Sequence, residues 1–307
     1  MIICVYMNPT IDKTVYLDHL AVGGTNRPEY VVTHGGGKGV NAAVVLHTLG
    51  QPVKIMGLLY RSNGAVITDR LEKNGISHDF VLLDGEARTN TKLFDKKEQR
   101  VTEINEGGQE VTQAVIDEVA QAIINTVSKN DVVVLAGSLP PGCGDGLYAE
   151  MIDVLNQKGA RCVLDTSGNA LRLGVKKQPY FVKPNTDELT DITGIRAYSK
   201  SQMVAAAKRM IDDGISLVGV SMGENGALLC NKDACYYANP LQVDVLSTVG
   251  AGDSMVAGIV ANIDEPVDAA LRAGVAAATG SLVREGTSLC TKELFDRYSS
   301  LVKIDLL

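Results

Sequence analysis

A regular alternation of short apolar segments and longer amphipathic segments constrains the fold of this chain most strongly. From residue 111 onward it predicts a helix at residues 113–129, a buried strand at 131–136 and a second helix at 146–157, which Gly159 ends. Continuously apolar strands are typical of parallel sheets that are buried on both faces. The order of elements therefore predicts an α/β fold with a mostly parallel sheet covered by helices.

The same pattern extends over the rest of the chain. Further strands are expected at residues 2–7, 53–59, 76–83, 161–165, 180–183 and 216–222, and further helices at 40–49, 65–73, 200–213, 251–262, 267–279 and 291–302. A length of 307 residues suits one large domain, and no linker interrupts the pattern. We therefore expect residues 1–307 to fold as a single domain.

Two pairs of segments break the alternation. They predict β-hairpins, at residues 13–17 with 29–33 and at residues 89–95 with 100–105. Although they are distant in sequence, the two hairpins could form one small sheet. Such a sheet is either a lid over a site or a peripheral addition, and the pattern alone does not decide. A lid would comprise about residues 12–34 and 88–106.

The composition argues against several classes of function. The formal net charge is −7 and no long basic run occurs, which disfavours binding to nucleic acid or to a membrane surface. The apolar start at residues 1–7 lacks the basic residues of a signal peptide. No stretch approaches the ~20 apolar residues needed to span a bilayer. We therefore expect a cytoplasmic protein.

The six cysteines do not indicate a metal site. They form no C-x-x-C pair, and the spacing of Cys230 and Cys235 across an expected hairpin suits zinc poorly. In a cytoplasmic chain, all six are expected to be reduced structural thiols. The four histidines also form no metal-binding or catalytic pattern.

The strongest chemical signal is Ser-Thr-Val-Gly-Ala-Gly-Asp at residues 247–253. It follows a strand-like run at 243–246 and opens the helix expected at 251–262. Its glycines let the backbone approach a ligand, and amides at a helix start can hold the charge on a transferred phosphoryl group. The helix dipole favours an ionised Asp253, which could accept the proton of an attacking hydroxyl. A glycine turn with a capping aspartate explains the same residues equally well.

A second glycine cluster occupies residues 35–39 and precedes a helix. It is not a P-loop, because Gly39 rather than Ser or Thr follows Lys38, and it does not match the dinucleotide-binding pattern. Flexible backbone followed by Asn41 at a helix start suits contact with a polar ligand such as sugar hydroxyls. A loop without a ligand is the alternative.

Residues 185–188, Asn-Thr-Asp-Glu, allow two interpretations. Asn185 and Glu188 have the spacing of a capping box at a helix start, which the sequence alone favours. The carboxylate could instead organise magnesium through water, because magnesium keeps much of its hydration.

Three other polar residues are weaker candidates. Ser138 follows a buried strand, where α/β enzymes bind ligands, although it could simply shape the turn. Arg88 and Arg27 lie beside the expected lid strands, and arginine suits bidentate contact with phosphate. A lone arginine is more often a solvated surface residue.

Together and in this order, these motifs resemble those of the ribokinase-like PfkB carbohydrate kinases. Residues 35–43, Gly-Gly-Gly-Lys-Gly-Val-Asn-Ala-Ala, resemble the N-terminal signature of that family. Residues 247–253 resemble its C-terminal signature, usually written D-T-x-G-A-G-D, with Ser247 in the first position, and residues 185–188 match its N-x-x-E motif. The resemblance covers essentially the whole chain. It implies a three-layer α/β/α sandwich with a β-sheet lid, which often pairs two subunits in the family.

The resemblance also implies roles for individual residues. Asp253 would be the catalytic base, beside an anion hole formed by Gly250, Ala251 and Gly252. The implied substrate-binding residues are Asp12, Arg27, Gly36, Gly37, Lys38, Asn41, Arg88 and Ser138. The implied nucleotide-binding residues are Lys183, Asn185, Ser221, Gly223, Gly226 and Ser247. Asn185 and Glu188 would organise Mg²⁺ through water.

The implied reaction is direct in-line transfer of a phosphoryl group from ATP to a sugar hydroxyl, without a covalent enzyme intermediate. The family often responds to K⁺ near the C-terminal motif, where Ser247, Val249 and the Gly286 turn could supply oxygens. The expected partners are thus ATP and a small sugar phosphate, with a homodimer possible through the lid.

The sugar is the least determined part of this prediction. Residues 8–12, Asn-Pro-Thr-Ile-Asp, resemble the branch that acts on phosphorylated ketohexoses, and Arg88, Lys38 and Arg27 are the candidates for binding the sugar phosphate. Residues 88–92 and 102–105 indicate fructose 1-phosphate, while tagatose 6-phosphate and fructose 6-phosphate stay open. A kinase of nucleosides or unphosphorylated sugars and a non-catalytic sugar or nucleotide sensor are the remaining alternatives.

Overall fold

The computed structural model describes residues 1–307, which form ten helices and fourteen strands. The strands are β1 (Ile2–Tyr6), β2 (Thr10–Leu17), β3 (Tyr30–Gly36), β4 (Val53–Tyr60), β5 (Ser77–Leu83), β6 (Arg88–Asp95), β7 (Arg100–Asn105), β8 (Val132–Ala136), β9 (Arg161–Asp165), β10 (Phe181–Val182), β11 (Leu217–Ser221), β12 (Ala227–Cys230), β13 (Cys235–Ala238) and β14 (Ile304–Leu306). The helices are α1 (Lys38–Thr48), α2 (Ala65–Lys73), α3 (Gln113–Thr126), α4 (Leu147–Gln157), α5 (Gly168–Val175), α6 (Thr186–Thr193), α7 (Lys200–Asp212), α8 (Ala251–Ala261), α9 (Val267–Leu282) and α10 (Lys292–Ser299).

Ten strands form one large sheet in the order β14-β13-β12-β11-β10-β9-β8-β1-β4-β5. The seven strands from β11 to β5 are parallel, whereas β12, β13 and β14 extend the sheet in antiparallel fashion. This arrangement confirms the predicted α/β fold with its mostly parallel sheet.

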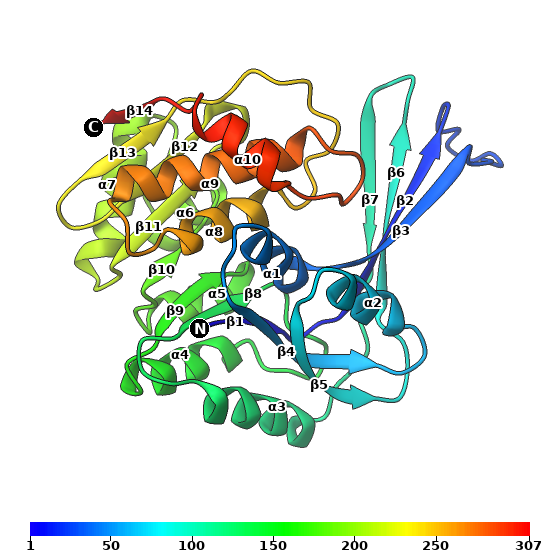
Figure 1. Cartoon of the computed structure of the whole chain (residues 1–307), viewed down its shortest axis with the longest axis horizontal. Coiled ribbons are helices and arrows are strands. Elements are labelled where there is room, and N and C mark those ends of the chain that lie inside the picture. The colour runs from blue at the N-terminus through cyan, green and yellow to red at the C-terminus, as the bar shows by residue number, and fades with distance from the viewer.

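Helices cover both faces of this sheet, as Figure 1 shows. Helices α1, α2, α8, α9 and α10 share one buried apolar cluster with the strands, and α3 to α7 share the other. Along β1, Cys4 and Tyr6 belong to the first cluster and Ile3 and Val5 to the second, and all four are buried. Burial on both faces explains why the strands are apolar throughout. None of the helices has the length and apolar content needed to cross a bilayer.

The two predicted hairpins form one small sheet that stands out from the side of the body (Figure 1). Its strand order is β3-β2-β6-β7, with β2 and β6 parallel and the two outer pairs antiparallel. Burial is greatest at the inner strand β2, which is mostly buried, whereas the edge strand β3 is largely exposed or half-buried and every residue of the edge strand β7 is exposed. One side of the small sheet thus faces the body and its far edge faces solvent.

One predicted strand is wrong. Residues 243–246 form a loop, and the amides of Leu246 and Ser247 both donate to the carbonyl of Leu282 at the end of α9. Because these amides bond to a helix end, no partner strand completes a ladder, and Val245 and Leu246 are about half exposed. The glycine-rich segment at 247–253 therefore follows a loop.

The expectation that all six cysteines are reduced also differs from the structure. Cys230 and Cys235 are opposite each other in the β12–β13 hairpin, with Cα atoms 4.1 Å apart, and they form a disulfide. The hairpin register brings the two sulfurs together, which the spacing in sequence did not reveal. The other four cysteines are free.

Candidate active site

A cleft of about 380 Å³ lies at the carboxyl end of the parallel strands, beside the small sheet. Strand β1 pairs with β4 on one side and with β8 on the other, so the direction of winding changes there. In open α/β sheets this switch point is where ligands bind. The lining is mostly polar, and the predicted site residues in it are Asp12, Gly37, Lys38, Asn41, Arg88, Ser138, Gly250 and Asp253.

Asp253 lies in the first turn of α8 and is only 8% exposed. Gly250 caps this helix with a φ of 76°, a conformation that favours glycine, and a Cβ there would lie 2.6 Å from Leu289. Asn41 donates from Nδ2 to Oδ2 of Asp253 at 2.8 Å. Ala251 and Gly252 begin the helix, so their amides lie beside the carboxylate at its positive end.

The protonation of Asp253 differs from what the helix dipole alone predicts. Burial raises the pKa of its carboxyl, while Lys38, the bond from Asn41 and Lys183 oppose that rise, and Asp165 adds to it. A carboxylate with a raised pKa is a stronger base than an ordinary aspartate. The site can therefore accept a proton more readily than the sequence indicated.

Asp165, a residue that sequence reasoning missed, joins the two lysines of the site. Its Oδ1 lies 3.1 Å from Nζ of Lys38 and 3.6 Å from Nζ of Lys183, and its side chain is almost fully buried. Burial opposes ionisation, but Lys183 and Lys38 outweigh it and lower the pKa of Asp165. Burial likewise opposes the charge on Lys38, yet Asp165 and Asp253 raise the pKa of that ammonium. Lys38 is thus held as a cation beside the start of α8, and Lys183 contacts the same carboxylate.

Asp165 had a detectable signal in the sequence. It ends the buried strand β9, and the carboxyl ends of neighbouring parallel strands meet at one edge of a sheet.

Asp12 is held by an ion pair within the small sheet. Nζ of Lys92, on the parallel neighbour β6, lies 3.0 Å from Oδ1 of Asp12, and both side chains are buried. A Cβ at Gly36 would lie 2.0 Å from Oδ2 of Asp12, so only glycine fits there. The hydroxyl of Tyr6 donates to the carbonyl of Gly36 at 2.7 Å and fixes this loop. Sequence reasoning missed Lys92, because a lysine on a strand normally faces solvent.

Arg88 connects the small sheet to the body. Its Nη2 donates to Oγ of Ser138 at 3.0 Å, its Nε to Oγ1 of Thr10 at 2.9 Å and its Nη1 to the carbonyl of Glu106 at 2.9 Å. Burial lowers the pKa of its guanidinium, which nevertheless stays charged because arginine titrates far above neutrality. Arg27, by contrast, lies in the exposed loop between β2 and β3 and does not line the cleft.

On the other side of the site, Asn185 and Glu188 form the capping box that the sequence favoured. Asn185 Oδ1 accepts from the amides of Asp187 and Glu188, and Glu188 Oε2 accepts from the amide of Asn185 at 2.8 Å. Glu188 also helps to stabilise the charge on Lys38. No cluster of three or more His, Cys, Asp or Glu side chains suited to a metal ion occurs in the molecule.

The remaining predicted nucleotide-side residues lie next to this box. Ser221, at the end of β11, forms a bridge with Asn185, and Gly223 and Gly226 flank the turn that follows, with φ of 55° and 87°. Ser247 is buried outside the cleft, where its hydroxyl donates to the carbonyl of Gly286 at 2.6 Å. Its oxygen also accepts from the amide of Val249 at 3.2 Å and so orders the approach to α8.

Several residues of the small sheet reach the cleft without having been predicted. Asn90, Glu103 and Asn105 line it from β6 and β7. Oδ1 of Asn90 is buried and has no hydrogen-bond partner within the protein. A buried acceptor of this kind normally has a partner, which a bound hydroxyl would supply. Strand periodicity alone did not reveal which face of β6 and β7 would meet the body.

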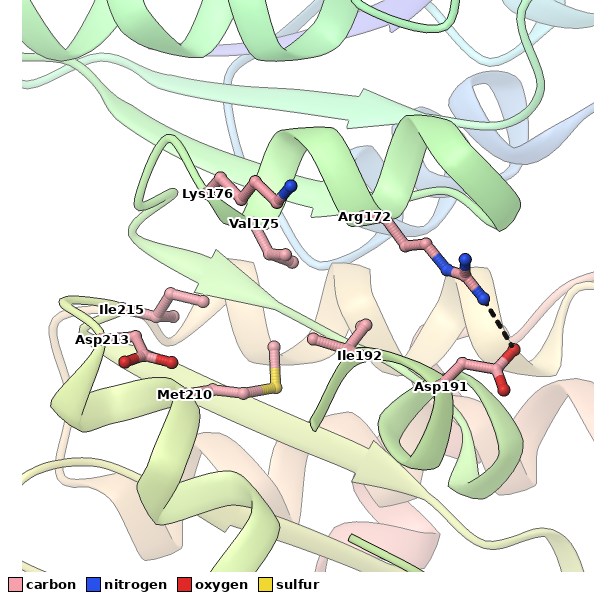
Figure 2. A pocket seen from close by; sticks show the side chains of 8 residues that line it. All are labelled: Arg172, Val175, Lys176, Asp191, Ile192, Met210, Asp213 and Ile215. Carbon is pink, nitrogen blue, oxygen red and sulfur yellow. Dashed lines mark ion pairs between the residues drawn. The ribbon is translucent and has the colours of Figure 1, made fainter. Parts of the chain in front are cut away.

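A second surface pocket is far less suited to chemistry. It has a volume of about 430 Å³, lies between α5, α6 and α7, and contains none of the predicted site residues. Figure 2 shows Arg172 directed at Asp191, 3.8 Å away, above the apolar side chains of Ile192 and Met210. The chemistry-bearing side chains are therefore concentrated in the cleft at the end of β1.

Comparisons with known proteins identify the family of this chain. The family model described as pfkB family carbohydrate kinase matches residues 6–294. The chain is 34% identical to 1-phosphofructokinase of Bacillus subtilis over 99% of both chains. It is also 34% identical to 1-phosphofructokinase of Escherichia coli K12, over 83% of this chain and 81% of that one.

Among solved structures, phosphofructokinase-2 of Escherichia coli in complex with substrates and products superposes with a TM-score of 0.93. It covers 98% of each chain at 24% identity, and this likeness shows the fold. Other structures of that protein are described as a complex with potassium and as a tetrameric inhibited form. On the family match and the identity to these relatives, the chain belongs to the pfkB family of carbohydrate kinases, enzymes that transfer a phosphoryl group to a sugar hydroxyl.

Proposed function

We propose that this kinase phosphorylates fructose 1-phosphate with ATP and releases fructose 1,6-bisphosphate and ADP. One observation carries the proposal: a single polar cleft holds a buried base, Asp253, at a helix start and two cations, Arg88 and Lys38, at its walls. Lys38 does not by itself distinguish a phosphorylated from an unphosphorylated sugar, and Arg88 is the cation that favours a substrate phosphate. Relatives that are 32–38% identical and named 1-phosphofructokinase support the same sugar.

The chemistry follows from the position of Asp253. Its carboxylate takes the proton of the free C6 hydroxyl as that oxygen bonds to the γ-phosphorus of ATP, and the bond from the γ-phosphorus to the bridging oxygen of ADP breaks. The amides of Gly250, Ala251 and Gly252, with Lys183 beside them, stabilise the charge on the transferred group. Asp165 keeps Lys183 and Lys38 in place.

The sugar would lie between the two sheets. Arg88 binds its phosphate with the guanidinium edge that now contacts Ser138, and Asp12 accepts hydrogen bonds from its hydroxyls. Asn90 supplies the buried acceptor without a partner. These contacts orient the free hydroxyl toward Asp253, which is the main contribution of a kinase to catalysis.

The residues around Glu188 fit magnesium in chemical type. Magnesium prefers oxygen ligands, keeps several waters and needs only one or two carboxylates in addition to substrate phosphates. Glu188 offers such a carboxylate beside the nucleotide side, with one oxygen committed to the cap of α6. Bound Mg²⁺ would neutralise charge on the ATP phosphates, and Glu188 would hold one of its waters. For potassium, Ser247, Val249 and the Gly286 turn remain the predicted sources of oxygen.

The small sheet is proposed to act as a lid and as the surface that pairs two subunits. Its β6 residues Arg88, Asn90 and Lys92 line the cleft, so movement of the sheet would open or close it. On the same sheet Tyr30, Val31, Val101 and Ile104 are 41–56% exposed. Light scattering of the purified chain tests the pairing: a monomer at every concentration would contradict it.

The experiment that tests the function is a coupled assay of ADP release. Fructose 1-phosphate, fructose 6-phosphate, tagatose 6-phosphate and fructose are compared at equal concentrations with Mg-ATP. The proposal predicts the highest kcat/KM with fructose 1-phosphate. Preference for tagatose 6-phosphate or fructose 6-phosphate would replace the sugar but keep the reaction. No turnover with any of them would favour a sugar or nucleotide sensor.

A further inference from the structure

Arg70 is a partly buried cation next to the site to which the proposed reaction gives no role. It lies on α2, and its guanidinium bonds to three separate segments of the chain. Nη1 donates to the carbonyl of Gly35 and to Oδ1 of Asn41, the latter at 3.3 Å, and Nη2 donates to the carbonyl of Thr287 at 3.3 Å. The glycine-rich loop, the start of α1 and the loop after α9 therefore meet at one side chain.

The position of Arg70 is built into the packing. A Cβ at Gly35 would lie 2.6 Å from Cα of Ile67, so glycine lets α2 lie directly against the loop. Arg70 forms no ion pair, and burial lowers the pKa of its guanidinium, with Asp12, Tyr6 and Asp253 opposing that effect through space. Removing a cation from water costs free energy, and contacts with neutral oxygens recover little of it, so Arg70 contributes little to stability. Its placement is better explained by what it orients.

The amide of Asn41 is the group that Arg70 orients. Arginine can only donate, and an ionised carboxylate can only accept. With Arg70 on one side and Asp253 on the other, only one orientation of the amide satisfies both: Oδ1 toward Arg70 and Nδ2 toward Asp253. The reverse orientation would place donor against donor and acceptor against acceptor. Asn41 is 3% exposed, so water cannot easily replace either partner.

We infer that Arg70 is a positioning residue, which locks the Asn41 amide so that its Nδ2 donates to the catalytic carboxylate of Asp253. The inference rests on the proposed role of Asp253 as the base. Arg70 itself touches neither substrate in this arrangement, because it does not line the cleft. It acts through Asn41 and determines how Asp253 is held.

The consequence is a change in the protonation of Asp253 when Arg70 is lost. The bond from Asn41 lowers the pKa of Asp253, as do Lys38 and Lys183, whereas Asp165 raises it. Without Arg70 only Asp253 itself favours this orientation of the amide, so the bond from Asn41 is held less firmly and the base is protonated over a wider range of pH. Asp12, Tyr6 and His34 are the other titratable groups near Arg70. Burial lowers the pKa of the His34 imidazole, and the guanidinium of Arg70 lowers it further.

The experiment compares pH profiles of kcat for Arg70→Met and for the parent enzyme, with whichever sugar phosphate the parent turns over. Arg70→Met is expected to move the acid limb of kcat upward by up to about one pH unit, the scale of one lost hydrogen bond to a charged group. The KM for ATP is expected to stay unchanged. Arg61→Met is the matched control, because Arg61 pairs with Asp84 at the surface, and no shift is expected from it.

A double-mutant comparison separates orientation of the amide from the loss of a positive charge. In an Asn41→Ala background there is no amide to orient. Adding Arg70→Met should therefore leave the acid limb of kcat at the same pH as in Asn41→Ala alone. An equal shift in both backgrounds, or none in either, would overturn the inference. If Arg70→Met does not fold, as judged by circular dichroism, Arg70→Gln is compared in the same way, since its shorter amide falls short of Asn41.

The outcome is separate from that of the proposed function. A parent enzyme that turns over no sugar phosphate refutes the function before Arg70 is considered. The parent enzyme could instead turn over substrate while Arg70→Met gives the same pH profile as Arg61→Met. That result would refute only the role of Arg70.

Discussion

The large and the small sheet meet at one cleft but differ in how they are built. Strands β1 and β8 of the large sheet are buried throughout, between two layers of helices, whereas β7 of the small sheet is exposed along its whole length. The body contributes Asp253 and the start of α8, and the small sheet contributes Asp12, Arg88 and Lys92. On the proposed function, the deeply buried body carries the reaction, and the more exposed small sheet carries recognition of the sugar.

The two buried carboxylates of the cleft, Asp12 and Asp253, reflect the same difference between the small sheet and the body. Asp12 has a lysine 3.0 Å away, while Asp253 accepts a hydrogen bond from the neutral Asn41 and has a raised pKa because it is buried. On the proposed function, Asp12 accepts hydrogen bonds from sugar hydroxyls beside its lysine, whereas the raised pKa of Asp253 favours uptake of a proton. The different surroundings of the two aspartates thus suit them to different proposed roles.

The largest expected effect is that of Asp253→Asn, which removes the base and keeps its shape. We expect kcat to fall by about 10²–10⁴-fold, the range for loss of a general base. ATP should still bind, because the amides at the start of α8 and Lys183 remain. Steady-state kinetics and calorimetric titration of ATP measure the two quantities, and near-parental turnover would contradict the assignment.

Asp12→Asn is the matched change on the small sheet. It should act mainly on the KM for the sugar phosphate, because Asp12 binds and does not take up the proton. A loss of kcat as large as that of Asp253→Asn would remove the distinction between the two aspartates.

The second prediction compares the stability of the two sheets. Ile3 in β1 is fully buried and Ile104 in β7 is 56% exposed. Ile3→Ala should lower the free energy of unfolding by about 2–5 kcal/mol, because it leaves a cavity in the core. Ile104→Ala should change it by no more than about 0.5 kcal/mol in the monomer. Urea denaturation measures both, and similar values for the pair would contradict the difference in burial.

Much of the large sheet was predictable from the sequence, because its strands and helices have distinct periods. The helix at α2 and the buried strands β8 and β9 were predicted at or within a residue of their observed bounds. The false strand at residues 243–246 shows the limit of that signal. A short apolar run predicts a strand whether or not a partner strand is available to accept hydrogen bonds from its amides.

The glycine-rich parts of the site were predictable, whereas its ion pairs were not. Gly250 to Asp253 and Gly36 to Asn41 stand out as local motifs. The contacts of Asp165 with Lys38 and of Asp12 with Lys92 join residues 127 and 80 positions apart. Local pattern carries no information on such pairs, which depend on the register of strands that meet only after folding.

The third prediction concerns recognition by the small sheet. Arg88→Ala should raise the KM for the sugar phosphate by about 10–100-fold, because hydrogen bonds to charged groups contribute about 1.5–3 kcal/mol. The KM for ATP should change little, since Arg88 lies on the sugar side with Ser138. Arg27→Ala is the comparison, because Arg27 lies in the loop between β2 and β3 and outside the cleft of its own chain. Equal rises for both substrates would contradict the role of Arg88.

The smallest expected effect is a displacement of the pH profile of kcat from the one that an ordinary aspartate base would give. The base must be ionised to act, so kcat falls as the pH falls through the pKa of Asp253. Because burial raises that pKa, the acid limb should lie above the value of about 4 that is typical of aspartate.

Unfolding should not obscure this limb. The lowered pKa of Asp165 adds stability that is present above the unfolded-state value and is lost only as the pH falls toward the lower folded value. Asp165 therefore still stabilises the folded state while Asp253 takes up its proton, and activity should return when the pH is raised. Circular dichroism recorded at the same pH values as kcat checks this. A limb at or below about pH 4, or loss of activity that tracks unfolding, would mean that burial does not make Asp253 a stronger base than an ordinary aspartate and that the difference between the two sheets is one of packing alone.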